Sequence, residues 1–150
     1  MTELPPTLAA QLFLLTYDRD RERFTGRGHI GYVLRGAALA ELHLRGHLAD
    51  EDGRPVVTAR ADRPADPVLA GLLDEIARSR PRTWKHWIGR RGSRTRRAVL
   101  DGLVEGRWVD RHPRRLFGIV PFDRIVLLRR PAHTRLRDQI AAALRESTPA

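Results

Sequence analysis

Arginines gather between residues 90 and 97, where their spacing suits the binding of a phosphate group. We expect a helix over residues 94–105, preceded by Arg90 and Arg91. The start of this helix contains Arg94, Arg96 and Arg97. Their guanidinium groups would lie beside the free backbone N–H groups of the first helical turn. Because cations at this end oppose the helix dipole, the arrangement costs stability unless an anion neutralises it. The cluster therefore favours an anion site, with a solvated basic face as the alternative.

The charge of the whole chain is concentrated in the same segment. The 150 residues include 28 Lys+Arg and 18 Asp+Glu, which gives a formal net charge of +10. Lys85 is the only lysine, an imbalance typical of GC-rich coding, so the number of arginines alone carries no functional weight. Their position is informative, because residues 80–115 hold 12 cations and three acids. Nearly all of the excess positive charge lies there.

Other chemistries lack the residues that they need. The chain has no cysteine, which excludes disulfides, thiolate zinc sites, iron–sulfur clusters and cysteine nucleophiles. None of its three serines stands in a Gly-Xaa-Ser-Xaa-Gly turn. His43 and His47 are four apart without a third ligand nearby, and Gly26-Arg27-Gly28 lacks the third glycine of a dinucleotide loop. We therefore expect no catalytic residues, no cofactor, no metal and no enzymatic activity.

Helices and short hairpins must position these arginines. Apolar spacing predicts helices over residues 8–17, 29–45, 68–76, 84–88, 94–105 and 134–145, with a charged loop over 18–28. One hairpin is expected over 47–58, and strands near 108–109 and 116–120 are expected to pair around a turn at His112-Pro113. Residues 123–130 extend that second sheet or form a loop. The sequence predicts a mainly α fold with short β-hairpins (α+β).

Two of the expected helices, 29–45 and 94–105, lead directly into hairpins. Such helix-then-hairpin units are similar to winged-helix modules, so a winged-helix-like DNA-binding regulator is one alternative for the function. The length fits a single compact helical domain over residues 1–150, with residues 1–6 and 147–150 as flexible tails. A protein-interaction domain is a further alternative.

The length of the apolar stretches indicates whether the chain is expected to cross a membrane. Leu12-Phe13-Leu14-Leu15 and Ile125-Val126-Leu127-Leu128 are far shorter than the ~20 residues of a membrane-spanning helix. The acidic, proline-bearing start of the chain does not resemble a signal peptide. We expect a cytoplasmic protein whose membrane contact, on the inner face, is peripheral.

Three segments carry a family resemblance. They are Leu12-Phe13-Leu14-Leu15-Thr16-Tyr17-Asp18-Arg19, the block from Leu34-Arg35-Gly36 to Arg45-Gly46-His47-Leu48, and Leu103-Val104-Glu105-Gly106-Arg107-Trp108-Val109. With these, residues 8–145 resemble the Golgi phosphoprotein 3 family. The resemblance implies a non-enzymatic, mostly helical domain that docks on membranes by binding the head group of phosphatidylinositol 4-phosphate. Members usually continue with further helices, so this chain resembles a short member.

The resemblance also implies site residues. The arginine of the family's Leu-Arg-Gly motif is Arg35. Two later arginines, three apart in the family, fall at Ser93 and Arg96, or at Arg94 and Arg97 after a slip of one residue. The family's tryptophan falls at Gly26, with Phe24 close by. We expect Arg35 and the Arg94–Arg97 cluster to converge on one pocket, unless Arg35 forms a salt bridge to Glu41 or Asp18.

The leading hypothesis is a lipid-binding module. Its expected partners are an anionic phospholipid head group, phosphatidylinositol 4-phosphate by resemblance, and the membrane surface. The resemblance also implies a homo-oligomer through the hairpin near residues 114–122. We favour lipid over nucleic acid as the ligand.

Overall fold

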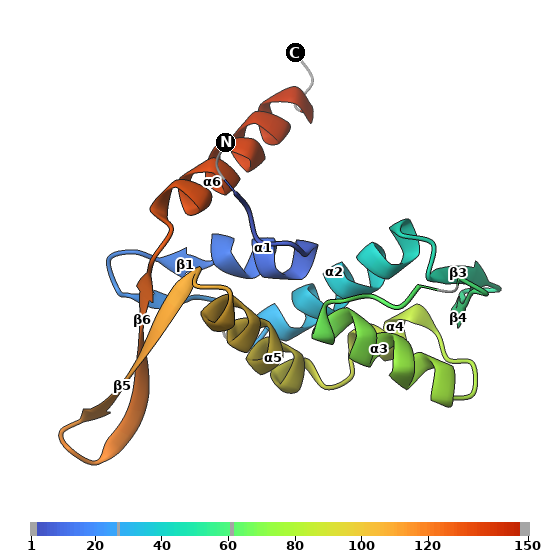
Figure 1. The fold of residues 1–150 in the computed structure, drawn as a ribbon, viewed down its shortest axis with the longest axis horizontal. Helices are drawn as coiled ribbons and strands as arrows, with labels where there is room; N and C mark the ends of the chain where they lie inside the picture. Colours follow the sequence, from blue (N-terminus) through green and yellow to red (C-terminus); the bar gives the residue numbers. More distant parts are fainter. Residues whose placement is uncertain (1–2, 27, 61, 148–150) are drawn as a thin grey trace.

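The computed structural model describes residues 3–26, 28–60 and 62–147. Its helices are α1 (Leu8–Leu15), α2 (Ile30–Leu44), α3 (Pro67–Arg78), α4 (Trp84–Ile88), α5 (Gly92–Glu105) and α6 (Arg130–Ser147), arranged as in Figure 1. Its strands are β1 (Tyr17–Asp18), β2 (Arg23–Phe24), β3 (Leu48–Glu51), β4 (Arg54–Val57), β5 (Val109–Leu116) and β6 (Val120–Leu127). They form three antiparallel pairs, β1–β2, β3–β4 and β5–β6, so the α+β prediction is confirmed.

Helix α2 lies at the centre and joins two apolar clusters. Its first half, including Leu34, packs with α1, α5 and the base of the β5–β6 hairpin, where Phe13, Leu103 and Ile125 are buried. Its second half packs with α3 and α4 through Leu42 and other buried side chains. Most helices are therefore held by one face against α2.

Side-chain caps explain where several helices begin. Thr7 accepts a hydrogen bond from the backbone N–H of Ala10 at the start of α1. Asp66 accepts one from Leu69 at the start of α3, where Pro67 is the first helical residue. Thr83 accepts one from His86 at the start of α4. Each cap satisfies a backbone donor that the helix itself leaves unpaired.

The second hairpin differs from the prediction. Both strands are longer than expected, residues 123–127 extend the sheet, and the chain turns at Phe117 and Gly118, not at His112-Pro113. Phe117 and Gly118 have φ of 53° and 72°, as the central residues of a tight hairpin turn require. Pro113 is tolerated inside β5 because each strand of a two-stranded sheet has a free edge, where no N–H is needed.

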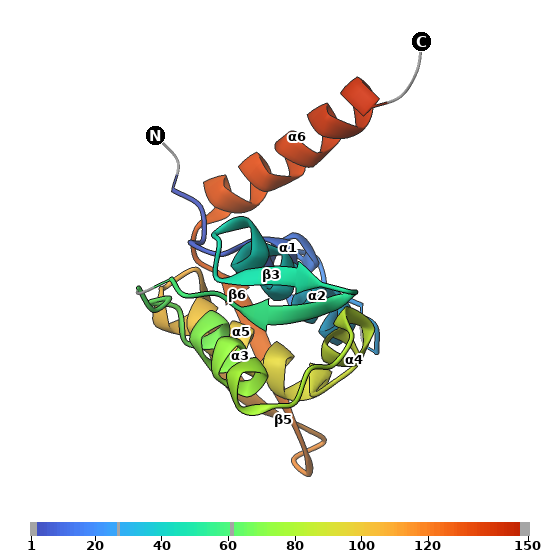
Figure 2. The same ribbon diagram turned by 90° about the vertical axis from the view of Figure 1, so that its right-hand side faces the viewer.

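The two ends of the chain also differ from the prediction. Helix α1 ends at Leu15, two residues earlier than expected, and the β1–β2 pair occupies Tyr17 and part of the charged loop predicted over 18–28. Helix α6 begins at Arg130, four residues earlier than expected. Of the expected tails, residues 1–2 and 148–150 lie outside the described residues, while Pro5 is buried. The start of α6 is buried at Ala132, His133 and Leu136, and its second half extends away from the body (Figures 1 and 2). Over the described ranges, no helix combines the length and the apolar character needed to cross a membrane.

Candidate functional site

The first turns of α2 and α5 touch at a pair of glycines. A Cβ atom on Gly31 would lie 2.8 Å from the Cα of Gly92, so a larger side chain at Gly31 cannot fit without a shift of backbone. The helices cross here at a distance that only a missing side chain permits. As a consequence, the N-termini of α2 and α5, each the positive end of a helix dipole, lie side by side.

A small hollow of about 170 Å³ lies at this crossing. Gly28, Gly31 and Tyr32 line it from the α2 side, and Gly92, Ser93 and Arg96 are among the residues that line it from the α5 side. No acidic side chain is among the described residues of its lining. The hollow therefore combines the positive ends of two helix dipoles with a guanidinium and a hydroxyl, a combination suited to a phosphate.

Arg96 is half-buried and reaches two features of the surface. Its guanidinium carbon lies 5.5 Å from the centroid of the Phe13 ring, a cation–π contact that fixes the side chain over the core. Besides the hollow, it lines a larger depression of about 540 Å³ between α5, the β1–β2 segment and the β5–β6 hairpin. Arg96 thus links the hollow to the base of the hairpin.

Arg35 lies in the interior, behind this surface. Its Nε–H donates to the backbone carbonyl of Trp87 at 3.0 Å, and its Nη1 donates to Thr95 Oγ1 at 3.5 Å. Its Nη2 lies 3.5 Å from Glu75 Oε2, close enough for an ion pair but without the geometry of a hydrogen bond. Burial lowers the pKa of the Arg35 guanidinium, and the charge of Glu75 opposes that shift.

Glu75 connects the buried arginine to the entrance of α5. Its other carboxylate oxygen, Oε1, lies 3.4 Å from Nη1 of Arg91, the residue that precedes α5. Arg91 adopts a left-handed backbone conformation with φ of 55°. The Arg35–Glu75–Arg91 network therefore ties α2, α3 and the start of α5 together, and so holds the hollow in shape.

The structure thus separates the arginines that the sequence grouped. It brings Ser93 and Arg96 together at the hollow, whereas Arg94 and Arg97 are exposed elsewhere on α5. Arg35 is not among the residues that line the hollow. Phe24, the aromatic residue nearest the family's tryptophan position, is buried against Phe13 with ring centroids 4.1 Å apart.

The alternative prediction for Arg35 was a salt bridge to Glu41 or Asp18. Arg35 does form an ion pair, but its partner is Glu75. Glu41 instead pairs with Arg45 and accepts a hydrogen bond from the backbone N–H of Leu8. Asp18 accepts hydrogen bonds from two backbone N–H groups of its own turn. Glu75 is the acid that meets Arg35, because α3 packs beside α2 and α5 in a way that sequence spacing does not reveal.

The β5–β6 hairpin forms the second feature of this surface. It extends away from the body (Figure 1), and its tip is apolar: Phe117 is 89% exposed and Ile119 is 80% exposed. Leu116, Val120 and Phe122 beside them are also exposed. Arg114 and Arg115 lie on the strand behind the tip. An apolar tip followed by cations is typical of a segment that enters the interface of an anionic membrane.

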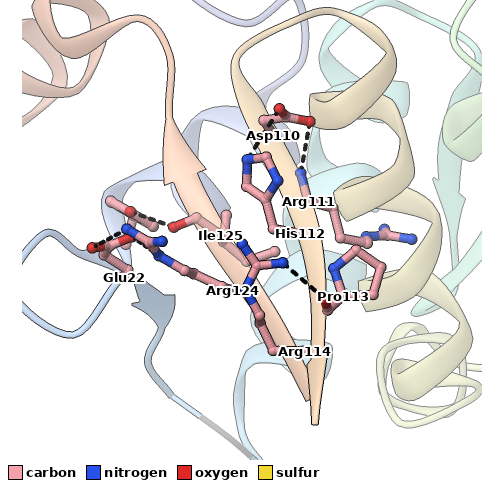
Figure 3. Close-up of polar contacts among 9 residues, drawn as sticks. Glu22, Asp110, Arg111, His112, Pro113, Arg114, Arg124 and Ile125 are labelled. Atoms are coloured by element: carbon pink, nitrogen blue, oxygen red, sulfur yellow. Dashed lines mark hydrogen bonds and ion pairs between the residues drawn. The ribbon is translucent and has the colours of Figure 1, made fainter. Parts of the chain in front are cut away.

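Polar contacts fix the base of the hairpin (Figure 3). Arg124 donates to both oxygens of Glu22, at 2.5 and 3.0 Å, and its guanidinium lowers the pKa of that carboxyl. The Tyr17 hydroxyl donates to the Ile125 carbonyl at 2.6 Å, and burial raises the pKa of the phenol. His112 lies 3.3 Å from Asp110 along the same strand. The hairpin is therefore anchored at its base while its tip stays exposed.

Sequence reasoning missed the residues that shape the hollow. Gly31 and Gly92 belong to different helices and carry no signal that they touch, since glycine within a helix has several explanations. Glu75 stands among other charged residues of α3 and has no distinguishing spacing. Among the described residues, no group of three or more His, Asp or Glu side chains is arranged to hold a metal ion.

The fold and these features define the class: an α+β domain of helix-then-hairpin units with a basic hollow and an apolar hairpin tip. The family model described as Golgi phosphoprotein 3 (GPP34) matches residues 8–150. The chain belongs to the Golgi phosphoprotein 3 family, a family of non-catalytic domains. No curated protein gives a significant match to the chain.

Proposed function

We propose that this protein is a non-enzymatic, peripheral membrane-associating domain that binds the phosphorylated head group of an anionic phospholipid. Family membership makes phosphatidylinositol 4-phosphate the first ligand to test. The observation that carries the proposal is the hollow at the Gly31–Gly92 crossing, where Arg96 and two helix N-termini surround a space whose lining, as far as the structure describes it, contains no acidic residue. A phosphomonoester brings negative charge and acceptor oxygens that complement the guanidinium, the hydroxyl and the helix dipoles.

The arginines divide into three roles in this proposal. Arg96 contacts the phosphate directly, together with the Ser93 hydroxyl. Arg94 and Arg97, exposed on the same helix, contribute to attraction by the anionic surface, at about 1 kcal/mol per cation near the membrane. Arg35 acts as a positioning residue, because its contacts with Trp87, Thr95 and Glu75 hold the entrance of α5.

The hairpin tip provides the apolar part of membrane binding. Phe117 and Ile119 are large, exposed side chains, and burying one such side chain contributes roughly 2 kcal/mol. The expected oligomer through residues 114–122 would bury the same tip. We favour the membrane, because pairing two tips would place Arg114 and Arg115 of both copies close together, whereas an anionic lipid surface neutralises them. The protein would then act at the cytoplasmic face of a membrane.

A flotation assay with liposomes of several compositions tests this function. Liposomes of neutral phospholipid alone would be compared with liposomes that also hold phosphatidylserine, phosphatidylinositol or phosphatidylinositol 4-phosphate at matched charge. The proposal predicts the strongest flotation with the phosphomonoester lipid. A gel shift with duplex DNA, on the same preparation, tests the winged-helix alternative. Absence of flotation on every anionic liposome would refute the proposal, and a salt-dependent DNA complex in its place would favour the alternative.

A further inference from the structure

An exposed aromatic residue lines the hollow between α2 and α5. Tyr32, the third residue of α2, is 53% exposed. A buried aromatic ring stabilises a fold through its large apolar area, and Tyr32 leaves about half of its area in water. Much of this residue is therefore available to a ligand.

The rest of the lining offers few side chains. Four of the residues around the hollow are glycines: Gly28, Gly31, Gly89 and Gly92. These positions present only backbone, and another lining residue, Ile30, is buried. Side-chain contacts to a ligand therefore come from Tyr32 on α2 and from Ser93 and Arg96 on α5.

The Tyr32 ring has a neighbour that fixes its position. A Cβ atom on Gly89 would lie 4.0 Å from Cε1 of Tyr32, so the ring lies beside the backbone at the end of α4. A ring that is already positioned loses little conformational freedom when a ligand binds. Tyr32 is thus suited to form one wall of a binding site.

The hollow has more space than a phosphate group alone needs. Its volume of about 170 Å³ is that of roughly five or six water molecules in the liquid, at about 30 Å³ each. A phosphate bound by Arg96 and Ser93 would occupy the α5 side, which leaves the α2 side for the group that carries the phosphate. That carrier would lie against Tyr32.

We propose that Tyr32 selects this carrier, by packing the face of its ring against the ring of a cyclic polyol phosphate such as an inositol phosphate. The inference rests on the proposed function, because it needs a phosphate at Arg96 and Ser93. The face of an aromatic ring is the negative part of its quadrupole and attracts the slightly positive C–H groups of a ligand. A cyclic polyol presents several C–H groups on one face, whereas a flexible glycerol chain must first be ordered. The site should therefore prefer a phosphate carried on a ring.

Two soluble phosphate monoesters of equal charge, inositol 1-phosphate and glycerol 3-phosphate, separate the effect of the ring from that of the phosphate. Each would be titrated into the full chain at low salt, with dissociation constants measured from the NMR shifts of the Gly31 and Gly92 amides. The wild type should bind inositol 1-phosphate about five- to tenfold more tightly. Tyr32→Leu should remove this difference by weakening the inositol ester alone. Tyr32→Phe keeps the aromatic ring and should retain the difference.

Two further variants separate Tyr32 from its neighbours. Arg96→Ala should weaken both esters, because both carry the phosphate. Val33→Ala is the matched control, since Val33 is exposed beside Tyr32 on α2 but is not among the residues that line the hollow. It should change neither affinity, and circular dichroism would verify that each variant is folded.

Flotation extends the comparison from soluble esters to lipids. Liposomes with phosphatidylinositol 4-phosphate would be compared with liposomes that hold phosphatidic acid at matched charge, because phosphatidic acid carries a phosphomonoester without a ring. The wild type should prefer the first lipid, and Tyr32→Leu should bind the two alike. A preference for the soluble inositol ester without any flotation would support the Tyr32 contact and refute the membrane role.

Equal wild-type affinities for the two esters would overturn the role of Tyr32, while a weakening of both by Arg96→Ala would leave the phosphate site standing. A Tyr32→Leu variant that weakens both esters alike would also overturn the inference, because the residue would then only shape the hollow. Binding of neither ester, together with no flotation on any anionic liposome, would refute the proposed function and this inference with it.

Discussion

Gly31 and Gly92 bring the backbones of α2 and α5 into contact: a Cβ atom on Gly31 would lie 2.8 Å from the Cα of Gly92. This contact places two helix N-termini beside Arg96 and so creates the hollow on which the proposed function depends. The shape of the site is therefore determined by two residues that carry no functional group.

Replacing Gly31 with alanine should open the helix crossing. The added methyl group would overlap backbone, so we expect a loss of about 1–3 kcal/mol in the free energy of unfolding, measured with urea. Gly36→Ala is the matched control, because it lies in the same helix with open space around its Cβ position. That variant should gain roughly 0.5–1 kcal/mol. A Gly31→Ala protein as stable as Gly36→Ala would contradict the contact.

The Arg35 network should matter for stability. Arg35→Ala removes the hydrogen bond to Trp87 and leaves Glu75 without its buried partner, so we expect a loss of roughly 3 kcal/mol or more. Arg78→Ala, an exposed arginine of α3, should change the unfolding free energy by no more than about 0.5 kcal/mol. Equal unfolding free energies for the two variants would show that Arg35 does not position the entrance of α5.

His133 should make the protein less stable in mild acid. Burial, and then the charge of Arg19, lowers the pKa of this imidazole below 6.5, and Arg19 Nε donates to its Nδ1 at 3.2 Å. The unfolded chain therefore takes up a proton that the folded protein resists. The stability that His133 contributes is fully present above pH 6.5 and is lost as the pH falls through 6.5 towards the lower folded-state pKa.

Urea unfolding at several pH values would measure this effect. His133→Gln should flatten the decline in unfolding free energy below neutral pH. Part of the decline should remain, because burial and Arg82 also lower the pKa of His86. The same slope in the wild type and in His133→Gln would contradict the assignment.

The hairpin tip should affect membrane binding without affecting the fold. Phe117→Ser and Ile119→Ser each remove an exposed apolar side chain, so the melting temperature should stay within a few degrees of the wild-type value. Each variant should bind anionic liposomes at least about tenfold more weakly, if its apolar side chain enters the lipid interface. Unchanged binding by the double variant would exclude the tip as a membrane contact.

Local signals in the sequence were enough to predict most helices. Helices α2, α4 and α5 begin and end within two residues of the predicted bounds, because apolar spacing and caps such as Thr83 act over one or two turns. The predicted position of the turn in the second hairpin was wrong. His112-Pro113 resembles a turn sequence, but it lies within β5, a strand that has a free edge.

The site was predicted only in part, for a physical reason. Arg35 and Glu75 are 40 positions apart, and their contact depends on how α2, α3 and α5 cross. Those crossings depend on side-chain packing over the whole core, which no single segment encodes. The family resemblance located Arg35 and Arg96 in the sequence, but it did not reveal that one lies inside the protein and the other at the hollow.

The most direct test of the central claim compares wild type with Arg96→Ala by flotation on liposomes that contain phosphatidylinositol 4-phosphate. Arg54→Ala is the control, because Arg54 is an exposed residue of β4 that carries an equal charge and lies outside the lining of the hollow. If Arg96 binds the phosphate, its loss should weaken flotation by about tenfold or more, while Arg54→Ala binds almost as wild type. Equal flotation of the two variants would contradict the proposed site.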